Sequence, residues 1–282
     1  MKIRLILWVF VLVLFSKSAE VLADEEVTET VFPIGELFEP LVADPKEPQF
    51  SAAVHRVNSS GQLGEFTASV VSYGEHFGLM RWQTTNTQQW QVSIVGALFA
   101  QFNMDADSKD LINADYTIGL SGTHRRGPIS YRLRVVHQST HLGDELLLGE
   151  SAPERINFSL EAVDFLGSYK WDEFRLYGGV GYLLNVEPSD LHRTALQFGG
   201  ESHGDKHSLL GGRWTSGMDI TAFEGDNWNI NTTVKFGLEF GKSGSGNRRI
   251  RVMLERYNGK APFGQFFNVG ITSYGLSAYL LF

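Results

Sequence analysis

A dense run of reactive side chains lies in the middle of the sequence, at His137-Gln-Ser-Thr-His-Leu-Gly-Asp-Glu145. A histidine two residues before a serine, on one face of one strand, can act as a general base beside a nucleophile. His137 and Ser139 are therefore the candidate catalytic residues, and hydrolysis of an acyl ester is the reaction they would suit. A zinc site formed by His137, His141 and Asp144 is an alternative on ligand type. A second alternative is a polar strand end followed by a surface loop.

The elements that would position these residues are strands. From Phe50 onward, many segments have apolar or aromatic residues at every second position. This pattern is typical of strands with one apolar and one polar face. The expected strands cover residues 50–58, 64–73, 90–102, 112–120, 129–139, 156–166, 174–184, 193–202, 209–223, 228–240, 249–257 and 266–282. Region 76–84 either extends the second strand or belongs to a loop. The lengths suit tilted membrane strands, and the even number suits a single-chain barrel.

The predicted fold class is therefore all-β: a closed, antiparallel, up-and-down transmembrane β-barrel of about 12 strands, over residues 50–282. The last strand has apolar residues at alternate positions and ends at Phe282, as in the closing strands of bacterial outer-membrane barrels. That ending predicts recognition by the outer-membrane assembly machinery. The barrel's other expected partners are the lipids of the outer membrane.

The amino terminus predicts export. Lys2 and Arg4 precede an apolar run at residues 5–15, and small residues before Asp24 offer a cleavage site. A run this short does not span a bilayer, so residues 1–23 are predicted to be a signal peptide. The leader carries a net charge of +2, so the mature chain of 259 residues carries −10, against −8 for the full sequence. The expected location is the outer membrane of a Gram-negative bacterium.

Composition excludes several classes of protein. A strongly acidic chain lacks the basic surface that nucleic-acid binding requires, so no nucleic-acid partner is expected. The absence of cysteine excludes a lipoprotein anchor and disulfide bonds. The sequence leaves any cofactor, and the oligomeric state, unknown.

The polar faces of the strands carry charges of both signs. Placing an arginine or lysine against the lipid at the bilayer midplane costs about 2–4 kcal/mol, so these side chains are expected to point into the lumen. The expected lumen-lining residues are Arg132, Arg134, Arg175, Glu201, Lys235, Glu239, Arg249, Arg251 and Glu255. If these side chains pair with one another, they either close the lumen or line a narrow path through it.

The same alternation places the candidate catalytic pair on the outside. Ile129, Tyr131 and Leu133 mark the lipid face of their strand, and continuing this period places His137 and Ser139 on that face. If the first strand rises from the periplasm, the pair lies near the outer end of the fifth strand. Three polar residues of the next expected strand, Asn157, Ser159 and Glu161, are expected on the lumen face. The sequence therefore identifies no third group that would orient the histidine.

Two further segments differ from the regular strand pattern. Residues 24–49 contain four of the eight prolines and are expected to lie outside the sheet, as a periplasmic tail or as an ordered plug. Their apolar residues, among them Leu37, Phe38 and Leu41, have helical spacing. Residues 203–207, His-Gly-Asp-Lys-His, are predicted to be a solvated loop.

Two resemblances follow from these motifs. The His-x-Ser spacing resembles that of outer-membrane phospholipase A and of lipid A deacylases, in which the pair faces the bilayer. The phospholipase has Asn-Gly after the serine, whereas Thr140 and His141 follow it here. Residues 37–45 (Leu-Phe-Glu-Pro-Leu-Val-Ala-Asp-Pro), 137–145 and 177–182 (Tyr-Gly-Gly-Val-Gly-Tyr) resemble an uncharacterised family of bacterial outer-membrane barrels, the domain of unknown function 1207. That resemblance implies a barrel and its location, not a reaction.

The sequence thus predicts an integral outer-membrane barrel and leaves its specific activity open. A lipid acyl-ester hydrolase would use the lipid-facing pair. A narrow solute channel would need an open lumen, although 12 strands enclose too little space for a wide pore. A structural or surface-interaction protein would have a lumen closed by ion pairs and would act through its loops.

Overall fold

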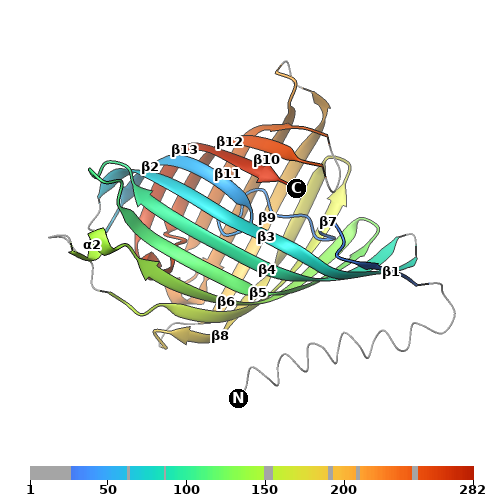
Figure 1. Cartoon of the computed structure of the whole chain (residues 1–282), viewed down its shortest axis with the longest axis horizontal. Helices are drawn as coiled ribbons and strands as arrows, with labels where there is room; N and C mark the ends of the chain where they lie inside the picture. The colour runs from blue at the N-terminus through green and yellow to red at the C-terminus, as the bar shows by residue number, and fades with distance from the viewer. Residues whose placement is uncertain are drawn as a thin grey trace.

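The structure, a computed structural model, describes residues 27–61, 64–85, 87–148, 155–189, 193–207, 210–242 and 247–282. The predicted signal peptide, residues 1–23, lies outside this part of the chain. The described residues form one antiparallel sheet that closes on itself, and its strands tilt across the barrel wall (Figure 1).

Twelve strands make the closed wall, and each pairs with its neighbours in the sequence. The ring closes because the last strand pairs with the first wall strand, with Leu276 opposite Val54. The wall strands are β2 (Phe50–Ser59), β3 (Glu65–Thr85), β4 (Gln88–Asn103), β5 (Leu111–Arg126), β6 (Ile129–Leu142), β7 (Ser159–Trp171), β8 (Phe174–Glu187), β9 (Thr194–His207), β10 (Arg213–Phe223), β11 (Ile230–Phe240), β12 (Arg249–Lys260) and β13 (Gly270–Leu281). The predicted 12-stranded barrel is confirmed.

Three sequence predictions about local structure need correction or completion. Region 76–84 extends β3, which runs to Thr85. Residues 24–49 do not lie wholly outside the sheet, because β1 (Thr28–Val31) pairs with the end of β3. This strand precedes Pro33, so each of its residues keeps the amide that a ladder needs. Residues 203–207 are not a loop but the end of β9.

The two ends of the barrel differ in their connections. At one end, β4 follows β3, β6 follows β5 and β8 follows β7 after turns of two residues. At the other end the connections are longer and contain α2 (Asp144–Leu148) and two short 3₁₀ turns, η1 (Glu224–Asp226) and η2 (Gly264–Phe266). The carboxy terminus lies at the short-turn end (Figure 1). In outer-membrane barrels the short turns face the periplasm and the longer loops face outward.

The outer wall is apolar, as the alternation predicts. Leu254 and Tyr274 are each 64 % exposed on neighbouring strands. Near the short-turn end, aromatic rings follow one another around the wall: Trp90 stacks on His124 with centroids 3.9 Å apart, and His124 is followed by Tyr131. Such a girdle is typical of a barrel wall at a membrane interface.

No helix among the described residues is long and apolar enough to cross a membrane.

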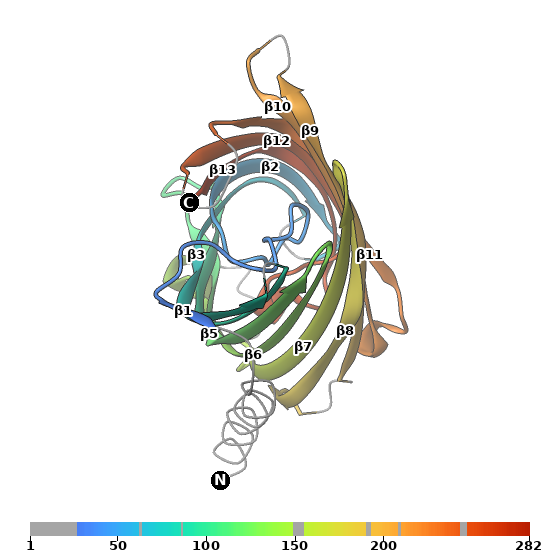
Figure 2. The ribbon, with the colours of Figure 1, turned by 90° about the vertical axis from the view of Figure 1, so that its right-hand side faces the viewer.

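The barrel encloses residues 33–49, named here the lumen segment, which cross the interior of the ring (Figure 2). Phe38 and Leu41 of this segment are buried against the inward-facing Leu166 and Tyr177 of β7 and β8. The helical spacing of its apolar residues was misleading, because no helix forms within residues 33–49. Phe38 and Leu41 share a face because they pack on the curved inner wall.

Candidate functional site

The register of three strands arranges the candidate catalytic residues on the outer wall. In an antiparallel pair, directly opposite residues lie on the same face of the sheet. His137 of β6 is opposite the outward-facing Ile118 of β5, which is 63 % exposed. On its other side, His137 is opposite Glu161 of β7. Ser139 is on the same face, two residues further along β6.

The expectation that Ser159 and Glu161 face the lumen is therefore wrong. Ser159 is opposite Ser139, and Glu161 is opposite His137, so both are on the outer face. The error came from β7 itself, which has apolar residues on both faces. Leu166 on its inner face is buried against the lumen segment, and a sequence pattern gives no sign of such a partner. Asn157 is exposed in the connection before β7 and belongs to neither face.

His137, Ser139 and Glu161 are neighbours on the outer face of the sheet. Directly opposite Cβ atoms lie about 4.5–5.5 Å apart, and residues i and i+2 of a strand are separated by about 6.6 Å. On this face His137 has Ser139 two residues along its own strand and Glu161 directly across on β7. Within the described chain these three side chains make no hydrogen bond to one another. Catalytic hydrogen bonds are often long before substrate binds.

The candidate site lies towards the loop end of the barrel. His137 is eight residues along β6 from Ile129, which begins the strand at the short-turn end. At about 3.3 Å per residue and a tilt of about 40°, this is a rise of roughly 20 Å within an apolar band about 25 Å tall. The site is therefore in the half of the band nearer the loop end.

The rest of the His137–Glu145 run has structural contacts. The ring of His141 packs edge-on against Tyr116, with centroids 5.5 Å apart. Thr140 points inward and donates a hydrogen bond of 2.7 Å to Asp115. Gly143 is required by packing, because a Cβ there would lie 1.8 Å from the carbonyl oxygen of Leu111.

The zinc alternative gains no support. Across the described parts of the chain, no three His, Cys, Asp or Glu side chains are placed to hold a metal ion.

The structure places the nine charged residues expected in the lumen on the inner wall, where most are buried and all are ion-paired. Arg132 and Arg134 approach Glu47, Arg134 also binds Asp164, Arg175 binds Glu201, Lys235 binds Glu255, and Glu239 binds Arg249 and Arg251. Glu47 belongs to the lumen segment, as does Glu39, which pairs with the wall residues Lys170 and Arg125. Strand periodicity does not predict these two contacts, although acidic residues in a proline-rich stretch before a barrel of inward arginines were a usable signal.

Glu47 of the lumen segment pairs with two arginines of the barrel wall. Its carboxylate accepts hydrogen bonds of 2.8 and 3.0 Å from one guanidinium nitrogen of Arg132. His76 is 3.6 Å away and Arg134 is 3.9 Å away. Burial opposes ionisation, but the guanidinium of Arg132 outweighs it and holds the pKa of Glu47 far below its ordinary value. This carboxylate therefore attaches the segment to the wall as an anion.

Glu36 has the opposite character. It accepts hydrogen bonds from Gln91 and Ser93, of 2.6 and 2.7 Å, but its second oxygen is buried without a hydrogen-bond partner among the described residues. Burial raises the pKa of Glu36 to about 7, because the ionised form is poorly solvated there. Glu47 and Glu36 of this segment thus favour opposite protonation states.

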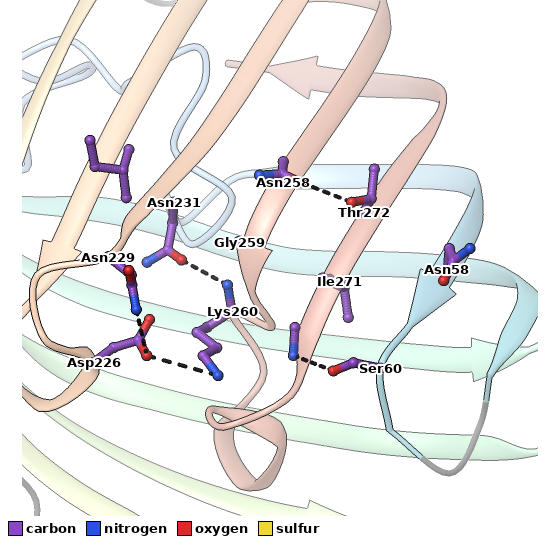
Figure 3. Close-up of a pocket in the computed structure, with 12 residues that line it drawn as sticks. Asn58, Ser60, Asp226, Asn229, Asn231, Asn258, Gly259, Lys260, Ile271 and Thr272 are labelled. Atoms are coloured by element: carbon purple, nitrogen blue, oxygen red, sulfur yellow. Dashed lines mark hydrogen bonds and ion pairs between the residues drawn. The ribbon is translucent and has the colours of Figure 1, made fainter.

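Two cavities lie at opposite ends of the barrel. The larger, of about 980 Å³, lies at the short-turn end between the lumen segment and the strand ends, and is named here the mouth cavity. The smaller, of about 410 Å³, lies at the loop end and is drawn in Figure 3. Its polar side chains already bind within the chain: Thr272 donates to Asn258, and Asn231 accepts from the backbone amide of Lys260.

A closed antiparallel barrel with an apolar outer wall and a charged interior defines an integral outer-membrane β-barrel protein. The family described as "Protein of unknown function (DUF1207)" matches residues 15–282, and the chain belongs to that family. Its members have no assigned reaction under that description. Among curated proteins, none matches the chain in sequence.

Solved structures similar to this chain are barrels. The KdgM porin in complex with disordered oligogalacturonate is 10 % identical, with a TM-score of 0.40, over 82 % of this chain and 99 % of that one. The β domain of the Bordetella autotransporter BrkA is 12 % identical, with a TM-score of 0.41, over 83 % and 98 %. An anion-selective porin from Comamonas acidovorans is 10 % identical, with a TM-score of 0.37, over 91 % and 100 %. These likenesses are too distant to assign an activity.

Proposed function

We propose that this protein hydrolyses acyl esters of lipids in the outer leaflet of the outer membrane, using Ser139, His137 and Glu161. The observation that carries the proposal is the cross-strand register, which places Glu161 opposite His137 and on the same face as Ser139. A nucleophile, a base and a carboxylate that orients the base are the three parts of a serine hydrolase site.

The reaction follows from these roles. His137 accepts the hydroxyl proton of Ser139 as its oxygen attacks the acyl carbonyl carbon, and Glu161 stabilises the imidazolium that forms. The ester C–O bond then breaks, and the leaving alcohol takes the proton from His137. Water, activated by the same histidine, attacks the acyl-serine and releases the fatty acid. The products are a carboxylic acid and a lipid that has lost one acyl chain.

The surroundings of the site support a lipid substrate. Ile118 and Tyr116 are exposed on β5 beside His137 and Ser139, and they offer an apolar track for an acyl chain. The site lies on the outer wall, which faces the lipid. A lipid substrate can therefore reach it directly, whereas a water-soluble substrate would first have to enter the bilayer. The position in the half of the apolar band nearer the loop end supports a lipid of the outer leaflet as the substrate.

The test uses the purified mature protein with phospholipid and glycolipid acyl esters in mixed micelles. Wild type should release fatty acid. His137→Ala should hydrolyse the ester about 10²–10⁴-fold more slowly, as expected for the loss of a general base. Ser139→Ala should lose at least as much, and Glu161→Gln should be impaired. Ser159→Ala is the matched control, because Ser159 is opposite Ser139 on the same face, and it should keep full activity. No hydrolysis by wild type, or equal activity in Ser139→Ala, would refute the proposal.

A narrow solute channel is the second candidate, and the mouth cavity is the observation in its favour. This cavity of about 980 Å³ is large enough to admit a small solute from the short-turn end. The lumen segment lies beyond it, attached by Glu47 to Arg132, so conduction would require the segment to move. A channel predicts conductance steps in planar bilayers that increase when residues 33–47 are deleted.

The cellular route belongs to the same proposal. A cleaved signal peptide would export the chain in a Gram-negative cell, and the assembly machinery would recognise β13 and Phe282. The ring of Phe282 lies 5.4 Å from that of Phe50, at the seam where β13 meets β2. Deleting Phe282 should lower the amount of folded barrel in outer-membrane fractions, and normal insertion of that variant would count against this route.

A further inference from the structure

The mouth cavity has a basic wall that the proposed hydrolysis does not use. Three arginines of β10 and β12 converge on one carboxylate, that of Glu239 in β11. Arg213 and Arg251 each approach it at 2.8 Å, and Arg249 approaches it at 3.1 Å. All four side chains line the cavity.

The charges in this cluster do not balance. Three guanidinium groups against one carboxylate leave a net charge of +2, since no other carboxylate of the described chain pairs with these arginines. Glu239 is only 4 % exposed and Arg251 only 5 %, so bulk water solvates them poorly. The Nε of Arg249 is buried and has no hydrogen-bond partner among the described residues. Convergent guanidinium donors in a concave, partly dry site are the features that bind phosphate.

We propose that this wall of the mouth cavity binds a small phosphate-bearing anion. A phosphate near neutral pH carries a charge of about −1.5 to −2, which matches the surplus, and its oxygens can accept the unused guanidinium N–H groups. The proposal is independent of the hydrolase site, which lies on the outer wall. It concerns a ligand that arrives from the solution at the short-turn end.

Carboxylates elsewhere in the lining restrict the size and charge of the ligand. Glu36, Glu75 and Glu173 also line the cavity, as do Arg125 and Lys170. A long polyanion that crossed the cavity would meet these carboxylates, whereas a single phosphate group at the arginine wall would not. The site is therefore expected to prefer inorganic phosphate or a compact phosphate ester over tripolyphosphate.

The experiment is a calorimetric titration of the detergent-solubilised mature protein with inorganic phosphate at low ionic strength. Arg249→Gln and Arg251→Gln should each weaken binding about tenfold or more, because each removes a charge-assisted hydrogen bond. Arg256→Gln is the matched control: Arg256 is on the same strand, is exposed, and faces outward opposite Tyr274. It should leave phosphate binding unchanged.

Glu239→Gln should change the affinity for phosphate in the opposite direction to the arginine variants. It raises the local charge to +3, so phosphate should bind several-fold more tightly and should raise the melting temperature of this variant more than that of wild type. Heat-modified migration on gels checks that each variant is a folded barrel. The proposal fails if wild type does not bind phosphate, if Arg256→Gln weakens binding as much as Arg249→Gln, or if acetate binds as tightly as phosphate. It also fails if folded Glu239→Gln binds phosphate less tightly than wild type.

Discussion

Replacing Glu47 by glutamine should release the lumen segment from the barrel wall. The change keeps the size of the side chain and removes one negative charge from a site that is fully buried. Arg132, 2.8 Å away, then loses its ion-pair partner, and Arg134 keeps its ion pair with Asp164. Nothing else in the barrel needs to change, because the backbone of the segment contains no helix or strand at this position.

The magnitude follows from the cost of leaving a buried charge unpaired. Removing one partner of a buried ion pair typically costs about 3–5 kcal/mol. Since each 1.4 kcal/mol is a factor of ten, the equilibrium between docked and undocked segment should shift by roughly two to three and a half powers of ten. The wall strands should keep their stability, because their own hydrogen-bond ladder is unaffected.

Hydrogen exchange of the purified barrel measures this shift. The amide of Val42 donates a 2.6 Å hydrogen bond to Glu201, so its exchange reports undocking of the segment. In Glu47→Gln, amides of the segment should exchange about 10²-fold faster or more, while those of β11 and β12 stay protected. The outward-facing Glu161→Gln is the control and should exchange like wild type. Unchanged exchange of the segment in a folded Glu47→Gln barrel would refute the reasoning.

Three further predictions follow from the described contacts. In the folded barrel the pKa of Glu36 is raised to about 7 from 4.5. Its contribution to the free energy of docking the segment is therefore largest below pH 4.5 and is lost as pH rises to 7. The loss should speed hydrogen exchange of the segment between pH 5 and pH 8, and Glu36→Gln should remove this increase. Phe38→Ala deletes a ring buried against Leu41 and beneath Arg132, and should destabilise the docked segment by about 3–5 kcal/mol, measured by the same exchange. Gly143→Ala forces a Cβ onto the backbone of Leu111, and should lower the melting temperature of the barrel and impair acyl hydrolysis together; a variant with wild-type values in both would contradict it.

The outer wall was predictable because the membrane imposes one rule at every position. Alternation alone placed Tyr274 and Leu276 on the lipid face, and the cost of charge in hydrocarbon placed Lys235 and Glu239 inside. His137 and Ser139 followed by extending that period along β6. These predictions needed no knowledge of which segments meet in space.

The remaining features depend on contacts between distant residues. The face of Glu161 was predicted wrongly because Leu166 makes the inner side of β7 apolar, and Leu166 is apolar because Phe38 and Leu41 lie against it. Three arginines around Glu239 come from two strands, and only the register brings them together. Sequence periodicity identifies a face, but it does not identify what that face meets.

The most direct test of the account is the environment of His137. The chain has no native cysteine, so single cysteines can carry a spin label without background. In lipid vesicles, a label at position 137 should be more accessible to oxygen, which concentrates in the bilayer, than to a water-soluble nickel complex. A label at the neighbouring position 138, on the inner face, should show little oxygen contact. The reverse order, or a label at 137 shielded from both reagents, would contradict a lipid-facing site.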